Sequence, residues 1–447
     1  MTIKRTMGLA VLLAAGVALA GCGHLHNPFK SNGPHTKYQG KGERIPIIAF
    51  DQSLKTSDTL KGQDFYLPAP QTVVAWPTPG GSNDSPVDHV DAARAFTVDW
   101  KAKFGQGSDR KTYVTAPPVA GDGRIYVMDG AARVSAFDLK SGQRVWSTDL
   151  SQRSKHDKEG FGGGIAFADG KLFVSSGFRF VAAVDAASGK QIWRTNTDAP
   201  VHAAPTVAGG RVIVESVDDN LLTFDTQTGA QGWTYQALTE TARILAATSP
   251  TVSGDAVVAS FGSGELVALQ TANGNGLWSL VLSKSNRNSA LSEIRDIPGR
   301  PVIYRGDVFA VSHSGVFADV ELRTGAQRWE LPITSVSTPW PAGDVVYITD
   351  TAGEVICVSR DNGQVYWIVD LNKDVKKKKE RALWSGPILS NNRVVVVSSR
   401  GEARALNAKT GALEKSLKIG APALQNPIAV GSDLYVVTQS AELIAIR

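Results

Sequence analysis

The sequence SPTVSGDAVVASFGSGELVALQTANGNGLW, from Ser249 to Trp278, decides the fold of this chain. It contains short apolar or alternating runs separated by glycine-containing turns, the last of which holds Asn273 and Gly274. Runs of β-forming residues bounded by Gly and Asn predict strands that are joined by hairpins. The stretch therefore predicts a four-stranded antiparallel sheet, and both of its faces are too apolar to stand alone in water.

The same unit recurs along most of the chain. Six copies end in tryptophan and a seventh ends in lysine, namely Trp146, Trp193, Trp233, Trp278, Trp329, Trp367 and Lys415. A glycine precedes each of these residues by four positions, at Gly142, Gly189, Gly229, Gly274, Gly325, Gly363 and Gly411. A period of roughly 40–50 residues with about four strands per repeat is the signature of a β-propeller.

Two incomplete units lie at the ends of this array. Ala95 to Trp100 reads as a lone strand with the terminal tryptophan, and Ala441 to Arg447 matches the third strand of a repeat whose fourth strand is missing. We predict that the early strand completes the last blade and closes the ring, which leaves no sheet edge unpaired between the first and last blades. The sequence thus predicts an all-β propeller of eight four-stranded antiparallel blades over residues 92–447.

The N-terminal part has a different character. Residues 1–21 combine Lys4 and Arg5 with an apolar stretch, as a signal peptide does. The stretch ends in Leu-Ala-Gly-Cys, which resembles the bacterial lipobox and implies a lipidated Cys22. Gly23 after the cysteine favours, by analogy with lipoprotein sorting, the outer membrane. Residues 22–91 are rich in Gly, Pro, Ser and Thr and predict a flexible lipidated tether.

Composition and residue spacing argue against several classes of function. The net charge of +5 gives no argument for a nucleic-acid surface. Cys357 is the one cysteine besides Cys22, so no internal disulfide is expected, and the seven histidines show no metal spacing. We find no spacing of Ser, His and Asp that predicts a catalytic site, and we expect no cofactor.

The repeat resembles the propeller repeat of the pyrroloquinoline-quinone type. Asp138, Asp185, Asp225 and Asn407 stand four residues before the repeated glycine. We expect these side chains to cap the amides of the turn, the glycine to supply a positive φ, and the tryptophan to pack between blades. The resemblance leaves a quinoprotein dehydrogenase as an alternative. Against it, the sequence has no adjacent cysteine pair and no acidic cluster suited to calcium.

The combination of a lipobox, a tether and these repeats resembles the BamB family of outer-membrane-protein assembly factors. The resemblance implies a non-catalytic scaffold on the periplasmic face of the outer membrane, docked on BamA within the BAM complex. Such a scaffold assists the folding and insertion of outer membrane proteins. Exposed blade edges add the hypothesis that nascent outer membrane proteins bind by β-augmentation.

Two inter-blade segments carry the expected docking residues. Residues 238–250 and 289–301 resemble neighbouring loops that contact BamA in the family. The carry-over gives six partner-binding residues: Arg243, Ile244, Leu245, Glu293, Arg295 and Asp296. Pro298 departs from the family pattern, which has an acidic residue there. The alternative, that these are exposed loops whose apolar residues pack on their own blades, stays open.

Overall fold

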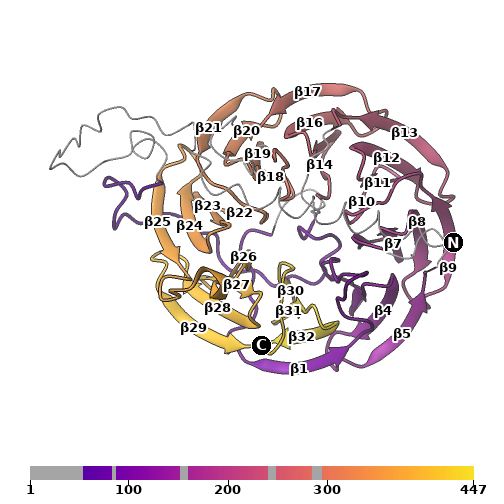
Figure 1. Ribbon diagram of the computed structural model, residues 1–447, viewed down its shortest axis with the longest axis horizontal. Coiled ribbons are helices and arrows are strands. Elements are labelled where there is room, and N and C mark those ends of the chain that lie inside the picture. Colours follow the sequence, from indigo (N-terminus) through magenta and orange to yellow (C-terminus); the bar gives the residue numbers. More distant parts are fainter. Residues whose placement is uncertain (1–53, 83–86, 152–159, 240–247, 284–293) are drawn as a thin grey trace, which may run out of the picture. The chain divides into compact units, whose positions relative to one another are not determined.

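The computed structural model describes residues 54–82, 87–151, 160–239, 248–283 and 294–447. All of them belong to one compact unit, Gln52–Arg447. Within these residues the chain forms eight four-stranded sheets, and Figure 1 shows them arranged as blades around a ring. The prediction of an all-β, eight-bladed propeller is confirmed.

The first four blades follow one another along the chain. Blade 1 consists of β2 (Val119–Gly121), β3 (Arg124–Met128), β4 (Arg133–Asp138) and β5 (Arg144–Asp149). Blade 2 consists of β6 (Gly163–Ala168), β7 (Lys171–Ser176), β8 (Phe180–Asp185) and β9 (Gln191–Asn196). Blade 3 consists of β10 (Thr206–Ala208), β11 (Arg211–Glu215), β12 (Asn220–Asp225) and β13 (Gln231–Gln236). Blade 4 consists of β14 (Thr251–Ser253), β15 (Ala256–Ser260), β16 (Glu265–Gln270) and β17 (Gly276–Val281).

The second half of the ring repeats this order. Blade 5 consists of β18 (Val302–Tyr304), β19 (Asp307–Val311), β20 (Phe317–Glu321) and β21 (Gln327–Leu331). Blade 6 consists of β22 (Trp340–Ala342), β23 (Val345–Thr349), β24 (Glu354–Ser359) and β25 (Val365–Asp370). A 3-10 turn, η2 (Lys378–Glu380), precedes blade 7, which consists of β26 (Trp384–Ser390), β27 (Arg393–Ser398), β28 (Glu402–Asn407) and β29 (Leu413–Lys418).

Blade 8 joins the two ends of the array. Its inner strands are β30 (Ile428–Val430), β31 (Asp433–Val437) and β32 (Glu442–Ile446), and its outer strand is β1 (Val98–Lys103). β1 pairs antiparallel with β32, so that Trp100 lies opposite Ala445, and the predicted closure is confirmed. The strand begins three residues later than predicted, since Phe96 has a φ of 59°, which interrupts an extended backbone.

The repeated tryptophan and glycine connect neighbouring blades, as predicted. Trp278 donates its indole N–H to the carbonyl of Leu322 in the next blade at 2.7 Å. Its ring covers Gly325, where an added Cβ would lie 2.8 Å from the ring. The same glycine contact joins Trp100, Trp146, Trp193, Trp233, Trp329 and Trp367 to Gly142, Gly189, Gly229, Gly274, Gly363 and Gly411. All seven glycines have a positive φ, which explains the residue type.

Lys415 stands where the other copies have tryptophan, and the fold explains the exception. The next sheet is blade 8, whose third and fourth strands come from opposite ends of the array. It therefore lacks the glycine turn on which a tryptophan would pack. Lys415 instead donates from Nζ to the main-chain oxygen of Ala95 at 2.9 Å, ahead of β1.

The Asp and Asn residues of the repeat cap the turns that hold four of these glycines. Oδ1 of Asp138 accepts hydrogen bonds from the amides of Lys140 and Ser141 at 3.1 and 2.8 Å. The hydrogen bond from the Ser141 amide is the main reason that the pKa of Asp138 is lowered. Asp185, Asp225 and Asn407 cap their turns in the same way. These residues stabilise the scaffold, as expected from the sequence.

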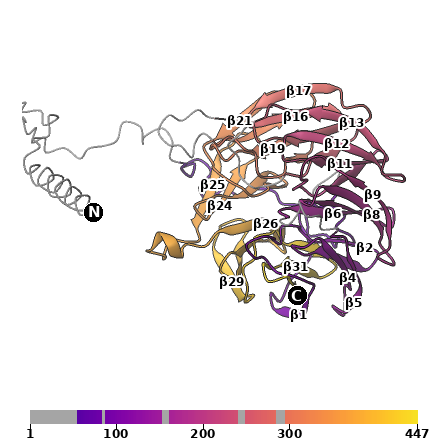
Figure 2. The same ribbon diagram turned by 45° about the vertical axis from the view of Figure 1, so that its right-hand side comes forward.

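The ring has two distinct faces. Each blade has an even number of strands, so the connections between blades emerge on one face together with the turns between second and third strands. We call this the loop face. The opposite side, the turn face, carries the turns between first and second strands and the glycine turns. Figure 2 shows the ring turned by 45° from the view of Figure 1.

The described part of residues 54–97, which we call the N-terminal segment, lies on the turn face and in the centre of the ring (Figure 1). Its main chain bonds to blades 1, 2, 6, 7 and 8, for example through Trp76 to Ala120, Val90 to Leu389, and Val73 to Gly431. Trp76 is 1% exposed and stacks against Trp340 with ring centroids 6.3 Å apart.

This packing differs from the predicted tether. From Leu54 onward the described residues belong to the folded body, and Phe65 and Val90 are buried with Trp76. Burial of a tryptophan removes about 200 Å² from water, which is worth roughly 5 kcal/mol. That gain is sufficient to hold an irregular, proline-rich segment in place. Residues 22–53 lie outside the described part of the chain.

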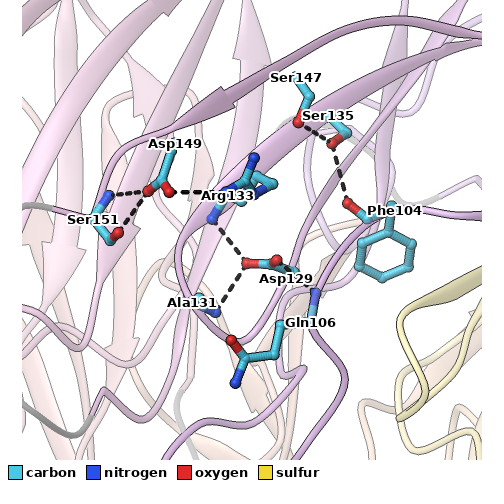
Figure 3. Close-up of polar contacts among 9 residues, drawn as sticks. All are labelled: Phe104, Gln106, Asp129, Ala131, Arg133, Ser135, Ser147, Asp149 and Ser151. Carbon is cyan, nitrogen blue, oxygen red and sulfur yellow. Dashed lines mark hydrogen bonds and ion pairs between the residues drawn. The ribbon is translucent and has the colours of Figure 1, made fainter.

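The chain that leaves β1 is attached to blade 1 by a buried carboxylate (Figure 3). Oδ2 of Asp129 accepts a hydrogen bond from the amide of Gln106 at 2.8 Å. Its Oδ1 accepts bonds from the amides of Ala131 and Arg133, each at 2.9 Å. One side chain therefore shapes the second turn of blade 1 and connects that blade to the closing strand. No helix in the described residues is long and apolar enough to cross a membrane.

Candidate docking face and axial cavity

The two predicted docking segments approach each other at blade 4. Leu238 follows β13, is 67% exposed, and donates its amide to Oε2 of Glu265 at 2.9 Å. Arg295 is exposed in the segment that precedes β18. Its carbonyl oxygen lies 3.0 Å from the position that a Cβ on Gly264 would take. Leu238 and Arg295 thus flank one turn, which ends at Glu265, on the loop face.

Asp296 has a different environment from Arg295. It is 5% exposed, and its carbonyl oxygen accepts a hydrogen bond from the amide of His313 at 2.8 Å. The next residue, Ile297, is 2% exposed and belongs to the core between blades 4 and 5. The chain therefore turns inward directly after Arg295. The other predicted site residues, Cys22, Arg243, Ile244, Leu245 and Glu293, lie outside the described residues.

The far end of the first docking segment is fixed to blades 3 and 4. The hydroxyl of Thr248 donates to the carbonyl of Ser260 at 2.9 Å and lies 3.1 Å from Oε2 of Glu215. Thr251, in β14, donates to the carbonyl of Pro301 at 2.6 Å. These bonds fix the end of the segment that leads into blade 4.

A cavity of about 420 Å³ lies at the centre of the loop face. All eight blades contribute to its wall through residues at or just before their first strands, which are Pro117, Gly163, Ala204, Ser249, Arg300, Thr338, Ser385 and Asn426. Tyr113, Val336 and Leu424 also line it and are 42%, 48% and 38% exposed, so the cavity opens on this face. Pro79 of the N-terminal segment lines it as well. We call it the axial cavity.

A family model described as "Outer membrane protein assembly factor BamB" matches residues 87–157 and 130–369, more than half of the chain. The chain belongs to the BamB family. The family resemblance inferred from the repeats and the lipobox is thereby confirmed.

Individual proteins agree with the family assignment. A BamB of Burkholderia pseudomallei is 27% identical over 350 residues, which cover 78% of this chain and 87% of that protein. The crystal structure of BamB from Moraxella catarrhalis matches with a TM-score of 0.67 at 18% identity, over 78% of this chain and 99% of that one.

A quinohemoprotein alcohol dehydrogenase from Comamonas testosteroni also matches, with a TM-score of 0.64 at 14% identity. The match covers 81% of this chain and 76% of that chain, and it shows a shared fold alone. In the described residues, no three His, Cys, Asp or Glu side chains are grouped as a metal site requires.

Two features of this region were not predicted from the sequence. The N-terminal segment carries Trp76 between prolines, and a lone tryptophan in a supposed tether was the signal for its docking. Arg300 in the wall of the axial cavity was the other. It precedes the proline that opens a repeat, where other copies have a small or amide residue.

Proposed function

We propose that this chain is a non-catalytic scaffold lipoprotein of the outer-membrane β-barrel assembly machinery. In this proposal it is anchored through a lipidated Cys22 on the periplasmic side of the outer membrane. It docks on BamA and so helps to orient that subunit while outer membrane proteins are folded and inserted. The proposal rests first on membership of the BamB family.

The asymmetry of the two faces supports docking through the loop face. The N-terminal segment lies across the turn face, and its main chain bonds to blades 1, 2, 6, 7 and 8. On the loop face, Leu238 and Arg295 project from two neighbouring segments beside one turn. An exposed aliphatic side chain next to a cation suits a small interface with a few anchor residues. Arg243, Ile244, Leu245 and Glu293 belong to the same two segments in sequence.

The test is co-purification of BamA with the tagged full chain from solubilised outer membranes. We expect Arg243→Glu and Arg295→Glu each to reduce recovery of BamA at least tenfold. Arg323→Glu is the matched control, since Arg323 is an exposed arginine on the turn face of blade 5. Unchanged recovery with both Arg243→Glu and Arg295→Glu would show that another surface makes the contact.

The fold shared with a quinohemoprotein dehydrogenase is tested in the same preparation. A bound quinone together with alcohol-dependent reduction of a dye would identify an enzyme and contradict the scaffold. We expect neither. Client binding at blade edges remains a hypothesis, and crosslinking of unfolded barrel precursors to the purified chain tests it. Absence of any adduct on the outer strands would count against it.

A further inference from the structure

Arg300 differs in residue type from the equivalent residues of the other repeats. It precedes the proline that begins the first strand of blade 5, and the equivalent residues of other blades are Ala204, Ser249, Thr338, Gly386 and Asn426. These residues are short, and most of them line the axial cavity. An arginine at this position places a cation in the wall of a cavity that the other blades line with neutral groups.

The guanidinium of Arg300 lacks a counter-ion among the described residues. The side chain is 7% exposed, and Nη1 donates to the hydroxyl of Thr78 over a long 3.4 Å. Nε and Nη2 have no hydrogen-bond partner in the described part of the chain. An isolated buried charge is costly unless it is paired and hydrogen-bonded. Burial lowers the pKa of Arg300 to about 10, which still leaves it charged at neutral pH.

A second, smaller space is also lined by Arg300. Its volume is about 30 Å³, enough for about one water-sized atom. It shares Pro79, Arg300, Thr338 and Asn426 with the axial cavity, so it extends the cavity toward blade 5. An oxygen atom of an anion fits such a space, and a carboxylate matches the fork of a guanidinium.

The opening of the cavity is aromatic on the side of blades 1 to 3. Tyr113 and Phe161 meet edge to face with centroids 5.2 Å apart, and Phe161 meets His202 in the same way, also at 5.2 Å. These three rings line the cavity, and Val336 lines it from the segment that precedes blade 6. The cavity thus combines an apolar, partly aromatic entrance with a single cation in its wall. Its volume is within the range of small-molecule sites.

We propose that the axial cavity binds an aromatic carboxylate, with Arg300 pairing the carboxylate and the rings of Tyr113, Phe161 and His202 holding the apolar body. Two kinds of molecule can provide an aromatic ring with a carboxylate: a small free acid and the C-terminal residue of a polypeptide. The site is separate from the docking residues Leu238 and Arg295, so its test does not depend on the partner.

The experiment is calorimetric titration of the full chain in detergent with 3-phenylpropionate, 3-phenylpropionamide and acetate. We expect saturable binding of the first, and at least tenfold weaker binding of the amide, which lacks the charge, and of acetate, which lacks the ring. Equal binding of the acid and the amide, or no saturable binding of the acid, would overturn the proposal.

Two variants test the two halves of the site. Arg300→Gln should weaken binding of 3-phenylpropionate at least tenfold, and Tyr113→Ala, at the partly exposed entrance, should weaken it about threefold without a risk to the fold. Wild-type affinity in a folded Arg300→Gln protein would refute the role of the arginine. If that variant does not fold, the amide and Tyr113→Ala comparisons decide. The tripeptide Gly-Gly-Phe and its amide then separate the sources: tighter binding of the peptide acid than of 3-phenylpropionate indicates a chain terminus, and the reverse indicates a small acid.

Discussion

Replacement of Asp319 by alanine should stabilise the propeller at alkaline pH and have little effect in acid. Asp319 lies in β20 opposite Trp329, where four other blades place Ala136, Ala183, Ala268 and Ala445 opposite their tryptophans. It is 1% exposed, and neither of its carboxylate oxygens has a hydrogen-bond partner among the described residues. A repeat position that suits a methyl group thus holds a buried acid.

The size of the expected stabilisation follows from the environment of the Asp319 carboxyl group. Burial, with a further contribution from the nearby Asp307, raises the pKa of Asp319 from 3.8 to about 7. At about 1.4 kcal/mol per pKa unit, the full shift corresponds to roughly 4 kcal/mol. The attraction of Arg328 and Arg360 is already part of that pKa, and relaxation of the protein and water penetration around a buried charge reduce the effect to about 2 kcal/mol. The small space left by alanine costs about 0.5 kcal/mol.

The effect of Asp319→Ala on the free energy of unfolding depends on pH. A raised pKa in the folded state means that the acid favours folding below its unfolded value, near 4, and that this advantage is lost as the pH rises through 7. The free energy of unfolding of Asp319→Ala should therefore exceed that of the parent by about 1.5 kcal/mol at pH 8. At pH 4.5 the two proteins should agree within about 0.5 kcal/mol.

Urea unfolding followed by tryptophan fluorescence at both pH values measures this difference. Asp361→Ala is the control, because Asp361 is in the same group of charges but its side chain is 80% exposed. It should change the free energy of unfolding by less than about 0.5 kcal/mol at either pH. The reciprocal change, Ala268→Asp, should destabilise blade 4 selectively at pH 8. If Asp319→Ala destabilised the protein equally at both pH values, Asp319 would be an ionised partner of the arginines and the argument would be wrong.

Three further predictions follow from the packing. Trp76→Ala should weaken docking of the N-terminal segment by about 3–5 kcal/mol. Limited proteolysis should then cleave within residues 54–91 while the propeller stays intact. The control is Val74→Ala, at a side chain that is 81% exposed, and it should leave the cleavage pattern unchanged. Gly325 has a φ of +73°, and Trp278 lies 2.8 Å from the position of an added Cβ, whereas Gly254 has a φ of +55° and open space around it. Gly325→Ala should therefore lower the free energy of unfolding in urea clearly more than Gly254→Ala does. Equal losses of unfolding free energy would show that the tryptophan contact is adaptable. Burial lowers the pKa of His89, whose Nε2 accepts a hydrogen bond from the amide of Asn392 at 2.8 Å. Docking of the N-terminal segment is therefore favoured above pH 6.5 and is lost as the pH falls. Proteolysis of residues 54–91 should be faster at pH 5 than at pH 7.5, and this difference should be smaller in His89→Gln.

The sequence was sufficient for the ring because each blade is encoded locally. The turn with Gly274 and the tryptophan at Trp278 lie within one repeat, and their partners lie in the adjacent one. Recurrence of the pattern then supplies the register. The closing strand could be predicted for the same reason, since Trp100 and the strand ending at Arg447 are complementary fragments of one repeat.

The N-terminal segment could not be predicted in this way. Trp76 and Val90 form main-chain hydrogen bonds with residues of blades 1 and 7 that lie far away in sequence, and no second copy of the segment exists to reveal a pattern. Its composition is that of a linker, and composition reports on the absence of regular structure rather than on the absence of docking. The position of Asp296 was missed for a related reason, because a loop sequence does not show where its chain turns inward.

Departures from the repeat are therefore the most informative residues of this chain. Any residue that matches its equivalents is explained by the scaffold, as the capping aspartates and the tryptophans are. Lys415 departs because the neighbouring blade is composite, and the fold accounts for it completely. Arg300 and Asp319 depart without such a reason, and both place a charge where other blades have a short, mostly neutral side chain. Each costs stability that a smaller residue would not, so a use outside the scaffold would account for the charge, and for Arg300 the proposed carboxylate site in the axial cavity is such a use.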